Sequence, residues 1–242
     1  MKRRAAGILK PTPRRRRLTL LLGLIVAGGF LTAPFLTATV PRLVSVKGTV
    51  ELVNSRIKTP GGRMDASGVV VWLKAVDGGA RNGGRTHRTL TQRGKRFIPH
   101  VLPVEVGSEV DFPNEDPFFH NVFSIYEGRR FDLGLYASGE TRPVTFNRPG
   151  ISYIFCNIHP QMSAIVIALE TPYVASTDQA GAFVFNGVPE GRYRMEVWHE
   201  RATPEHLATL SRVLQVGPAD VDLGSLRRSG CGKARARCLA RA

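Results

Sequence analysis

Three residue types that bind metals lie close together in Phe155–Met162, which reads FCNIHPQM. Cys156 is followed three positions later by His159 and after three more by Met162. A thiolate and an imidazole are strong ligands, whereas a thioether is weak and soft. This mixture suits copper better than zinc, which takes four firm ligands. The motif lacks one strong ligand, so a further histidine must come from elsewhere in the chain.

The best candidate for this further ligand is His120, in the stretch NEDPFFHNVFS. His120 lies where a loop enters an expected strand, and Cys156 lies where the expected strand ISYIFC leaves for a loop. If these strands are antiparallel neighbours, the two positions meet at the same end of a sandwich. The two histidines and the cysteine then form a trigonal set, with Met162 as a long axial ligand of one copper ion.

Other uses of Cys156 fit the sequence less well. A buried thiol beside a turn histidine would leave His120 and Met162 unexplained. A cysteine hydrolase needs its nucleophile at a helix start beside a histidine base, but Cys156 ends an apolar strand. No two histidines are separated by a single residue, and no second cysteine lies near Cys156. These absences disfavour an oxygen-reducing copper cluster and a dinuclear copper site.

The remaining histidines and one acidic pair receive plainer interpretations. His100 begins a strand and is interpreted as structural, and His199 follows a strand and is interpreted as a surface residue. Whether either of them binds a second metal is left open. His87, in a Gly-rich loop, is expected to be solvated, and the acidic pair at 115–116 is most simply a turn.

From Val44 onward the chain is typical of short β-strands separated by Gly, Pro, Asn and Asp. Several strands alternate: in ISYIFC, Ile154 and Cys156 share one face and Tyr153 lies on the other. We therefore expect an all-β fold built around an antiparallel sandwich. The expected strands are 44–53, 68–76, 100–106, 109–112, 120–125, 142–146, 151–156, 163–170 and 208–216.

The stretches VEVGSEVDFPNEDPFFHNVFS and FCNIHPQM resemble the cupredoxins, small blue copper proteins such as plastocyanin and amicyanin. The short spacing from Cys156 to Met162 is most similar to amicyanin. The run from RFIPHVLPVEVG to VWHE is similar to the methylamine-utilisation-type members. The resemblance covers roughly residues 89–200. It implies a Greek-key sandwich in which one type 1 copper ion carries single electrons, so the protein is expected not to be an enzyme.

The resemblance also implies roles for residues around the ligands. Asn121 would fasten the two ligand loops together, and Pro160 would stiffen the loop behind His159. Phe118 and Phe119, with Pro160, are candidates for an apolar patch at the edge of His159, where a redox protein of the cell envelope would dock. The alternative function is a periplasmic copper carrier, or a β-sandwich binding module without an electron-transfer role.

The chain on both sides of the copper-like region is similar to a carboxypeptidase regulatory-like, or prealbumin-like, β-module. SVKGTVELV and GVVVWLKAV precede that region, and TDQAGAFVFNGVPEGRYRMEV follows it. We expect a cupredoxin domain at 44–170, with its copper core at 88–170, and a small β-module at 171–222. We hypothesise that this module shares strands with 44–76, because alone it is too small to bury a core. The simpler arrangement makes 44–170 one sandwich.

Residues 1–41 predict export from the cytoplasm. The basic stretch MKRRAAGILKPTPRRRR precedes the apolar run LTLLLGLIVAGGFL at 18–31. We expect a periplasmic protein, either soluble after signal cleavage or held at the inner membrane by an anchor at 18–40. Outside the cytoplasm stable cysteines are usually paired, so Cys231 and Cys238 could pair with each other. Cys156 then has no obvious partner except a metal.

The formal net charge of +15 is concentrated at the two ends of the chain. Of 34 Lys and Arg residues, eight lie in 1–41 and six in 223–242, which leaves 20 against 19 acids in the body. The body is therefore nearly neutral, and we find no basic stripe interleaved with aromatics, so a nucleic-acid partner is not expected. The segment 223–242 is expected to be a disordered basic tail.

Overall fold

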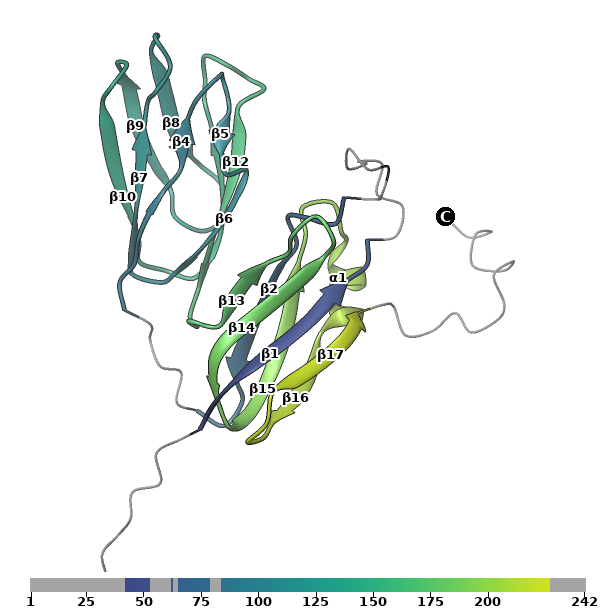
Figure 1. Ribbon diagram of the computed structural model, residues 1–242. Coiled ribbons are helices and arrows are strands. Elements are labelled where there is room, and N and C mark those ends of the chain that lie inside the picture. Colours follow the sequence, from purple (N-terminus) through teal and green to yellow (C-terminus); the bar gives the residue numbers. More distant parts are fainter. Residues whose placement is uncertain (1–41, 53–61, 63–64, 79–83, 227–242) are drawn as a thin grey trace, which may run out of the picture. The chain divides into compact units, whose positions relative to one another are not determined.

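The computed structural model describes residues 42–52, 62, 65–78 and 84–226 (Figure 1). The expected signal peptide or anchor at 1–41 and the cysteines at 231 and 238 lie outside these residues. Within the described part of the chain, no helix is both long and apolar enough to span a membrane.

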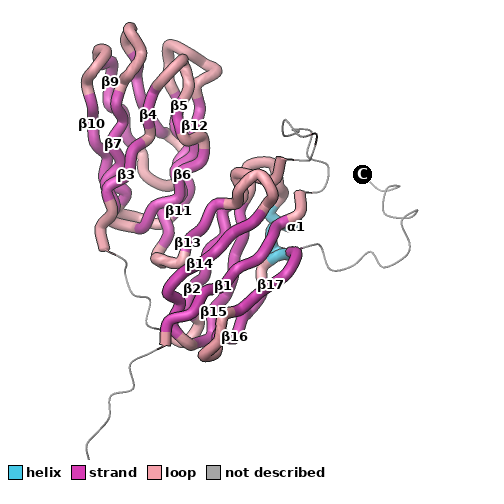
Figure 2. The backbone as a smooth tube through the Cα atoms, in the orientation of Figure 1, coloured by secondary structure: helices cyan, strands magenta, loops and turns pink. Residues whose placement is uncertain are grey.

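The described residues form an all-β structure with a single short helix (Figure 2). The strands fall into two groups by their pairing. We call the strands within 87–169 the central sandwich, and those within 43–75 together with 174–226 the split module. The predicted all-β class is confirmed.

The central sandwich contains ten strands. They are β3 (His87–Thr89), β4 (Thr91–Gln92), β5 (Phe97–Ile98), β6 (Val101–Glu105), β7 (Ser108–Pro113), β8 (His120–Ser124), β9 (Phe131–Tyr136), β10 (Thr141–Phe146), β11 (Gly150–Phe155) and β12 (Ser163–Leu169). One sheet has the order β10-β7-β3, another has the order β6-β12-β11-β8-β9, and β4 and β5 pair as a hairpin. The chain crosses between the two sheets, since β6 and β8 lie in one and β7 in the other, and β6 lies beside β12, which is far away in sequence, as in Greek-key sandwiches.

Alternation of side chains fills the core between these sheets. In β7, Val110 and Phe112 are fully buried, while Asp111 between them is only partly buried. In β11, Ile154 is buried, and Cys156 follows it into the same core. The predicted ligands His120 and Cys156 therefore lie in or directly after strands whose register is fixed by a buried face.

Strand β12 is buried on both faces, which explains its nearly continuous apolar sequence SAIVIAL. The alternate residues of Ala164–Ala168 pack into the core of the central sandwich. The residues between and after them, Ile165, Ile167 and Leu169, pack in a separate cluster with Val70 and Trp198. The split module therefore covers one face of this strand.

The split module is built from two separate pieces of the chain. Its elements are β1 (Leu43–Val50), β2 (Val70–Ala75), β13 (Val174–Ser176), β14 (Ala182–Pro189), β15 (Gly191–Trp198), α1 (Pro204–Leu210), β16 (Arg212–Val216) and β17 (Val221–Leu226). Its two sheets have the orders β14-β1-β17 and β13-β2-β15-β16.

A single sandwich at 44–170 would require β1 and β2 to pair with strands of that range, and they do not. β1 lies between β14 and β17, and β2 lies between β13 and β15, so both pair with strands that follow the central sandwich. This is the strand sharing that we hypothesised between 44–76 and 171–222. Neither piece alone has enough strands to enclose a core, and together they bury one between two sheets.

Two boundaries near the end of the chain differ from those expected. Residues 208–210 belong to α1 rather than to a strand, because Thr203 caps that helix and Pro204 occupies its first turn. β17 continues to Leu226 and so includes the start of the segment 223–242 that we expected to be a tail.

Candidate metal centre

The predicted ligands lie at one end of the central sandwich. His120 is the first residue of β8, and Cys156 directly follows β11. β8 and β11 are antiparallel neighbours, with Phe123 opposite Phe155. The start of one strand and the end of the other therefore meet at the same edge of the sheet, as the sequence pattern predicts.

The atoms of three predicted ligands converge. The Sγ of Cys156 lies 3.8 Å from the Nδ1 of His120 and 3.8 Å from the Nδ1 of His159. The two Nδ1 atoms are 3.1 Å apart. One thiol and two imidazole nitrogens thus surround a single point.

These separations suit one metal ion. With metal–nitrogen bonds of about 2.0–2.1 Å, a metal–sulfur bond of about 2.3 Å and angles near 120°, nitrogen and sulfur lie about 3.8 Å apart and the two nitrogens about 3.5 Å apart. The sulfur separations match, and the imidazoles need to move apart by only a few tenths of an ångström. A soft thiolate with two imidazoles is a donor set that copper accepts.

Two backbone hydrogen bonds close the loop that carries His159 and Met162. The N–H of Cys156 donates to the carbonyl of Met162 at 3.3 Å, and the N–H of Met162 donates to the carbonyl of His159 at 2.8 Å. The second bond closes a turn in which Pro160 is the second residue, where its fixed φ suits the turn. Met162 is 1% exposed and belongs to the same buried cluster as Cys156.

Asp116 is hydrogen-bonded to the ring nitrogen of His120 that does not face Cys156 and His159. Its Oδ2 lies 2.8 Å from the Nε2 of His120, and both side chains are buried. An ionised carboxylate can only accept, so Nε2 carries the proton. In the neutral ring Nδ1 then keeps its lone pair, and that lone pair is directed at the point shared with Cys156 and His159.

The same carboxylate also fixes the turn between β4 and β5. It accepts hydrogen bonds from the backbone N–H of Gly94 at 2.6 Å and of Lys95 at 2.9 Å. Burial by itself would raise the pKa of Asp116, but the hydrogen bonds from Lys95, His120 and Gly94 outweigh it, and the pKa is lowered. Asp116 is therefore an ionised group at the centre of a small buried network.

His159 is the most exposed of the four predicted ligands. His120, Cys156 and Met162 are all at most 3% exposed, whereas His159 is half-buried. Its ring lies 5.5 Å from that of Phe118, which also contacts the ring of His120 edge-on at 5.2 Å. Burial, followed by the charges of His120 and Lys95, lowers the pKa of His159.

The hydrogen bonds of Asn121 differ from the expected role. Its side-chain N–H donates to the Oδ1 of Asp132 on β9 at 2.7 Å, and its Oδ1 is buried without a partner among the described residues. We expected Asn121 to fasten the two ligand loops. Because β9 is paired with β8, the side chain of Asn121 hydrogen-bonds to this neighbouring strand rather than to the loop after β11.

The other histidines lie away from this centre. His100 contacts the carbonyl of Ser163 and, at 2.9 Å, the carboxylate of Glu200. Burial lowers the pKa of His199. His87 is an exposed residue of β3, where it lies 2.5 Å from Asp111 through Nε2.

His87 also lies 3.5 Å from Glu109 through Nδ1. Each of the two ring nitrogens of His87 therefore faces one carboxylate, and the protonated ring forms an ion pair with both. We expected His87 to be solvated; its side chain is exposed, and it also pairs with two carboxylates.

Sequence reasoning missed Asp116, which we interpreted as part of a turn. The signal that could have identified it is its position four residues before His120. A carboxylate close in sequence to a ligand histidine can bond the ring nitrogen that does not face the metal.

Comparisons with known proteins give structural neighbours. No protein-family model matches the chain, and no curated protein matches it. A Cu-containing nitrite reductase from Thermus scotoductus shares 30% identity over 40% of this chain and 25% of its own, with a TM-score of 0.34. A purple cupredoxin from Nitrosopumilus maritimus shares 21% identity over 34% of this chain and 99% of its own, with a TM-score of 0.32.

An oxidized amicyanin variant shares 19% identity over 34% of this chain and 80% of its own, with a TM-score of 0.32. The structural neighbours are cupredoxins. The chain spans only a quarter of the nitrite reductase. At TM-scores of this size, the evidence for a metal centre comes from the side chains themselves.

Proposed function

We propose that this chain holds one copper ion at His120, Cys156 and His159 and that it accepts and donates single electrons. The convergence of one Sγ and two Nδ1 atoms, each nitrogen 3.8 Å from the sulfur, carries the proposal. When bound, copper supplies a one-electron couple between Cu(I) and Cu(II). Met162, buried beside Cys156, is the proposed weak axial ligand.

The protein keeps its ligands in place while the charge changes. His120 is held by its strand and by Asp116, and Cys156 directly follows a strand that pairs on both sides. Buried apolar neighbours, including Val122 and Ile154, exclude water. A site of this kind changes little between oxidation states, which favours rapid electron transfer over catalysis of a substrate reaction.

Copper titration tests this function. We expect one equivalent of Cu(II) to produce an intense visible band from thiolate-to-copper charge transfer, which ascorbate bleaches and ferricyanide restores. Cys156→Ser should lose the band and keep the far-UV circular dichroism of the parent. Colourless binding, or rapid loss of copper to a chelator, would instead favour the copper carrier.

We further propose a periplasmic location, with redox proteins of the cell envelope as partners. The basic and apolar composition of residues 1–41 supports this location. Fractionation of cells that produce the full chain tests it, since the proposal requires recovery in the periplasmic or inner-membrane fraction.

A further inference from the structure

The proposed copper site meets solvent through one of its ligands. His120 is fully buried, and His159 is half-buried behind an apolar surface. Phe119 is 59% exposed and Ile158 is 46% exposed, and both are adjacent in sequence to residues of the site. An electron that leaves the proposed site has its shortest covalent path to solvent through His159.

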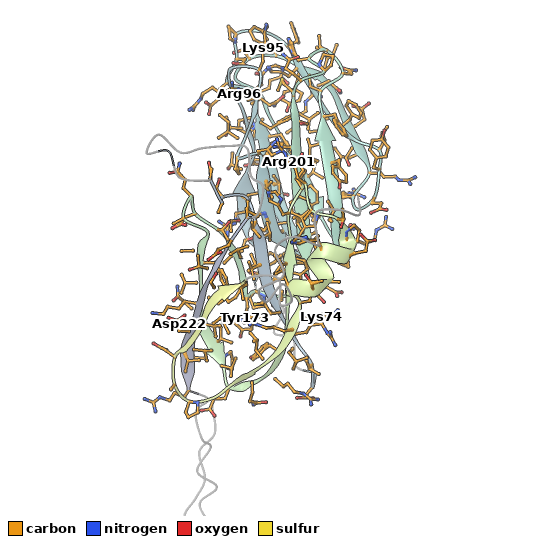
Figure 3. The ribbon with its side chains drawn as sticks, turned by 90° about the vertical axis from the view of Figure 1, so that its right-hand side faces the viewer. Lys74, Lys95, Arg96, Tyr173, Arg201 and Asp222 are labelled. Carbon is orange, nitrogen blue, oxygen red and sulfur yellow. The ribbon has the colours of Figure 1, made fainter. Side chains whose placement is uncertain are left out.

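Two cations lie beside this apolar surface. The Nζ of Lys95 lies 5.4 Å from the ring centroid of Phe118, the ring that contacts both histidine ligands. Arg96 is the next residue, is also exposed, and lies at the same end of the sandwich (Figure 3). The hydrogen bonds from Gly94 and Lys95 to Asp116 fix the turn, so the backbone of Lys95 is tied to the network around His120.

The carboxylates near this surface are already paired. Glu115 pairs with Arg93, and Glu140 pairs with Arg142. Asp116 is ionised, but it is only 5% exposed, and both of its oxygens already accept hydrogen bonds from Gly94, Lys95 and His120. By contrast, neither Lys95 nor Arg96 belongs to an ion pair within the described part of the chain.

We propose that the apolar surface at His159, with Lys95 and Arg96 at its margin, docks a redox protein whose contact face is acidic. This inference rests on the proposed function, since the partner exchanges one electron with the copper. Opposite charge at the margin raises the rate of encounter and orients the partner, while the apolar centre allows close contact. The body of the chain is almost neutral, so these two cations supply a local rather than a general attraction.

Electron transfer from two protein donors of opposite charge tests the docking surface. The copper-loaded full chain is mixed with reduced plant-type ferredoxin, which is acidic, or with reduced cytochrome c, which is basic. One electron passes from the donor to Cu(II), and bleaching of the visible band gives the rate. With ferredoxin we expect the rate constant to fall roughly three- to tenfold as ionic strength rises from about 10 to 300 mM.

The decisive variant is Lys95→Asn with Arg96→Gln. Asparagine is chosen because Lys95 has φ of 56°, a left-handed conformation that asparagine tolerates well. The double variant should keep the visible band, lose about fivefold in rate with ferredoxin at low salt, and not slow with cytochrome c. The matched control, Arg130→Gln with Arg194→Gln, removes the same charge from exposed positions outside the loops of the site and should behave as the parent.

The outcomes separate the inference from the function on which it rests. If the chain shows no visible band with copper, the proposed function is refuted before docking is measured. A second outcome is a blue parent chain whose Lys95 and Arg96 variant has the same salt dependence as the Arg130 and Arg194 control. This outcome refutes the acidic partner and leaves the proposed function standing. The control is needed because the terminal segments carry most of the net positive charge and could also attract ferredoxin.

Discussion

The carboxylate of Asp116 lies 2.8 Å from the Nε2 of His120 and leaves Nδ1 as the free nitrogen of that ring. The same carboxylate binds the backbone of Gly94 and Lys95. One buried acid therefore links the orientation of a proposed ligand to the turn that carries the cations of the proposed docking surface.

Replacement of Asp116 by Asn should weaken copper binding. An amide has one acceptor oxygen and cannot serve His120 and two backbone N–H groups as a carboxylate does. We expect a roughly 10- to 100-fold loss of Cu(II) affinity, measured by competition with a chelator. Glu115→Gln, which removes the adjacent and more exposed carboxylate, is the control and should bind as the parent does. Equal affinities in the two variants would show that Asp116 does not position the ligand.

Met162→Leu should keep copper and raise the reduction potential. Cu(I) is satisfied by three ligands, whereas Cu(II) gains more from a fourth donor along the axis, so loss of the axial thioether disfavours the oxidised state. A tenfold change in relative affinity corresponds to about 59 mV for one electron, and we expect a rise of this order by spectroelectrochemical titration. Met195→Leu changes a buried methionine in the split module and should leave the potential unchanged. A potential unaltered by Met162→Leu would contradict axial ligation.

The proposed ligands could be predicted from the sequence because each of them has a chemical type that is rare in this chain. Cys156 is the only cysteine in 1–230, and strand alternation places it at the sheet end where His120 begins the neighbouring strand. The cations at Lys95 and Arg96 could not be placed in this way. The proximity of Lys95 to Phe118 depends on a turn that Asp116 fixes, and short hairpins such as β4–β5 have little sequence signal.

The strand sharing of the split module could be hypothesised but not decided from the sequence. β1 and β2 have the alternating or apolar patterns of many strands, and these patterns do not specify a partner. Pairing depends on which strands complete a core, and the residues that complete this one, such as Phe185 and Met195, lie more than 100 positions away from β1 or β2. β9 was not predicted because Asp132 and Gly134, both poor strand formers, interrupt its apolar residues, and Gly134 has a φ of 65°.

The ion pair of His87 predicts a measurable pH effect. The hydrogen bond and the charge of Asp111 raise the pKa of His87 above its ordinary value. The stabilisation is therefore fully present below the unfolded pKa of about 6.5 and is lost as pH rises through the higher folded value. In an NMR titration, Asp111→Asn should lower the pKa of His87, whereas Asp77→Asn, which removes the partner of Arg192, should not. An unshifted His87 in the Asp111 variant would refute the pairing.

Tyr136 should contribute to stability through its hydroxyl group. This buried hydroxyl donates to the carbonyl of Phe112 at 2.9 Å and accepts from the Nε2 of Gln92 at 2.5 Å, and burial raises its pKa. Tyr136→Phe leaves two buried polar groups short of a partner and should cost about 1–3 kcal/mol in the free energy of unfolding, measured in urea on the copper-free protein. Tyr126→Phe, at a residue 56% exposed, should change it by less than about 0.5 kcal/mol. If both variants lose equally little, the hydroxyl of Tyr136 exchanges its protein partners for water, and the interior at this end of the sandwich is wetter than its burial indicates.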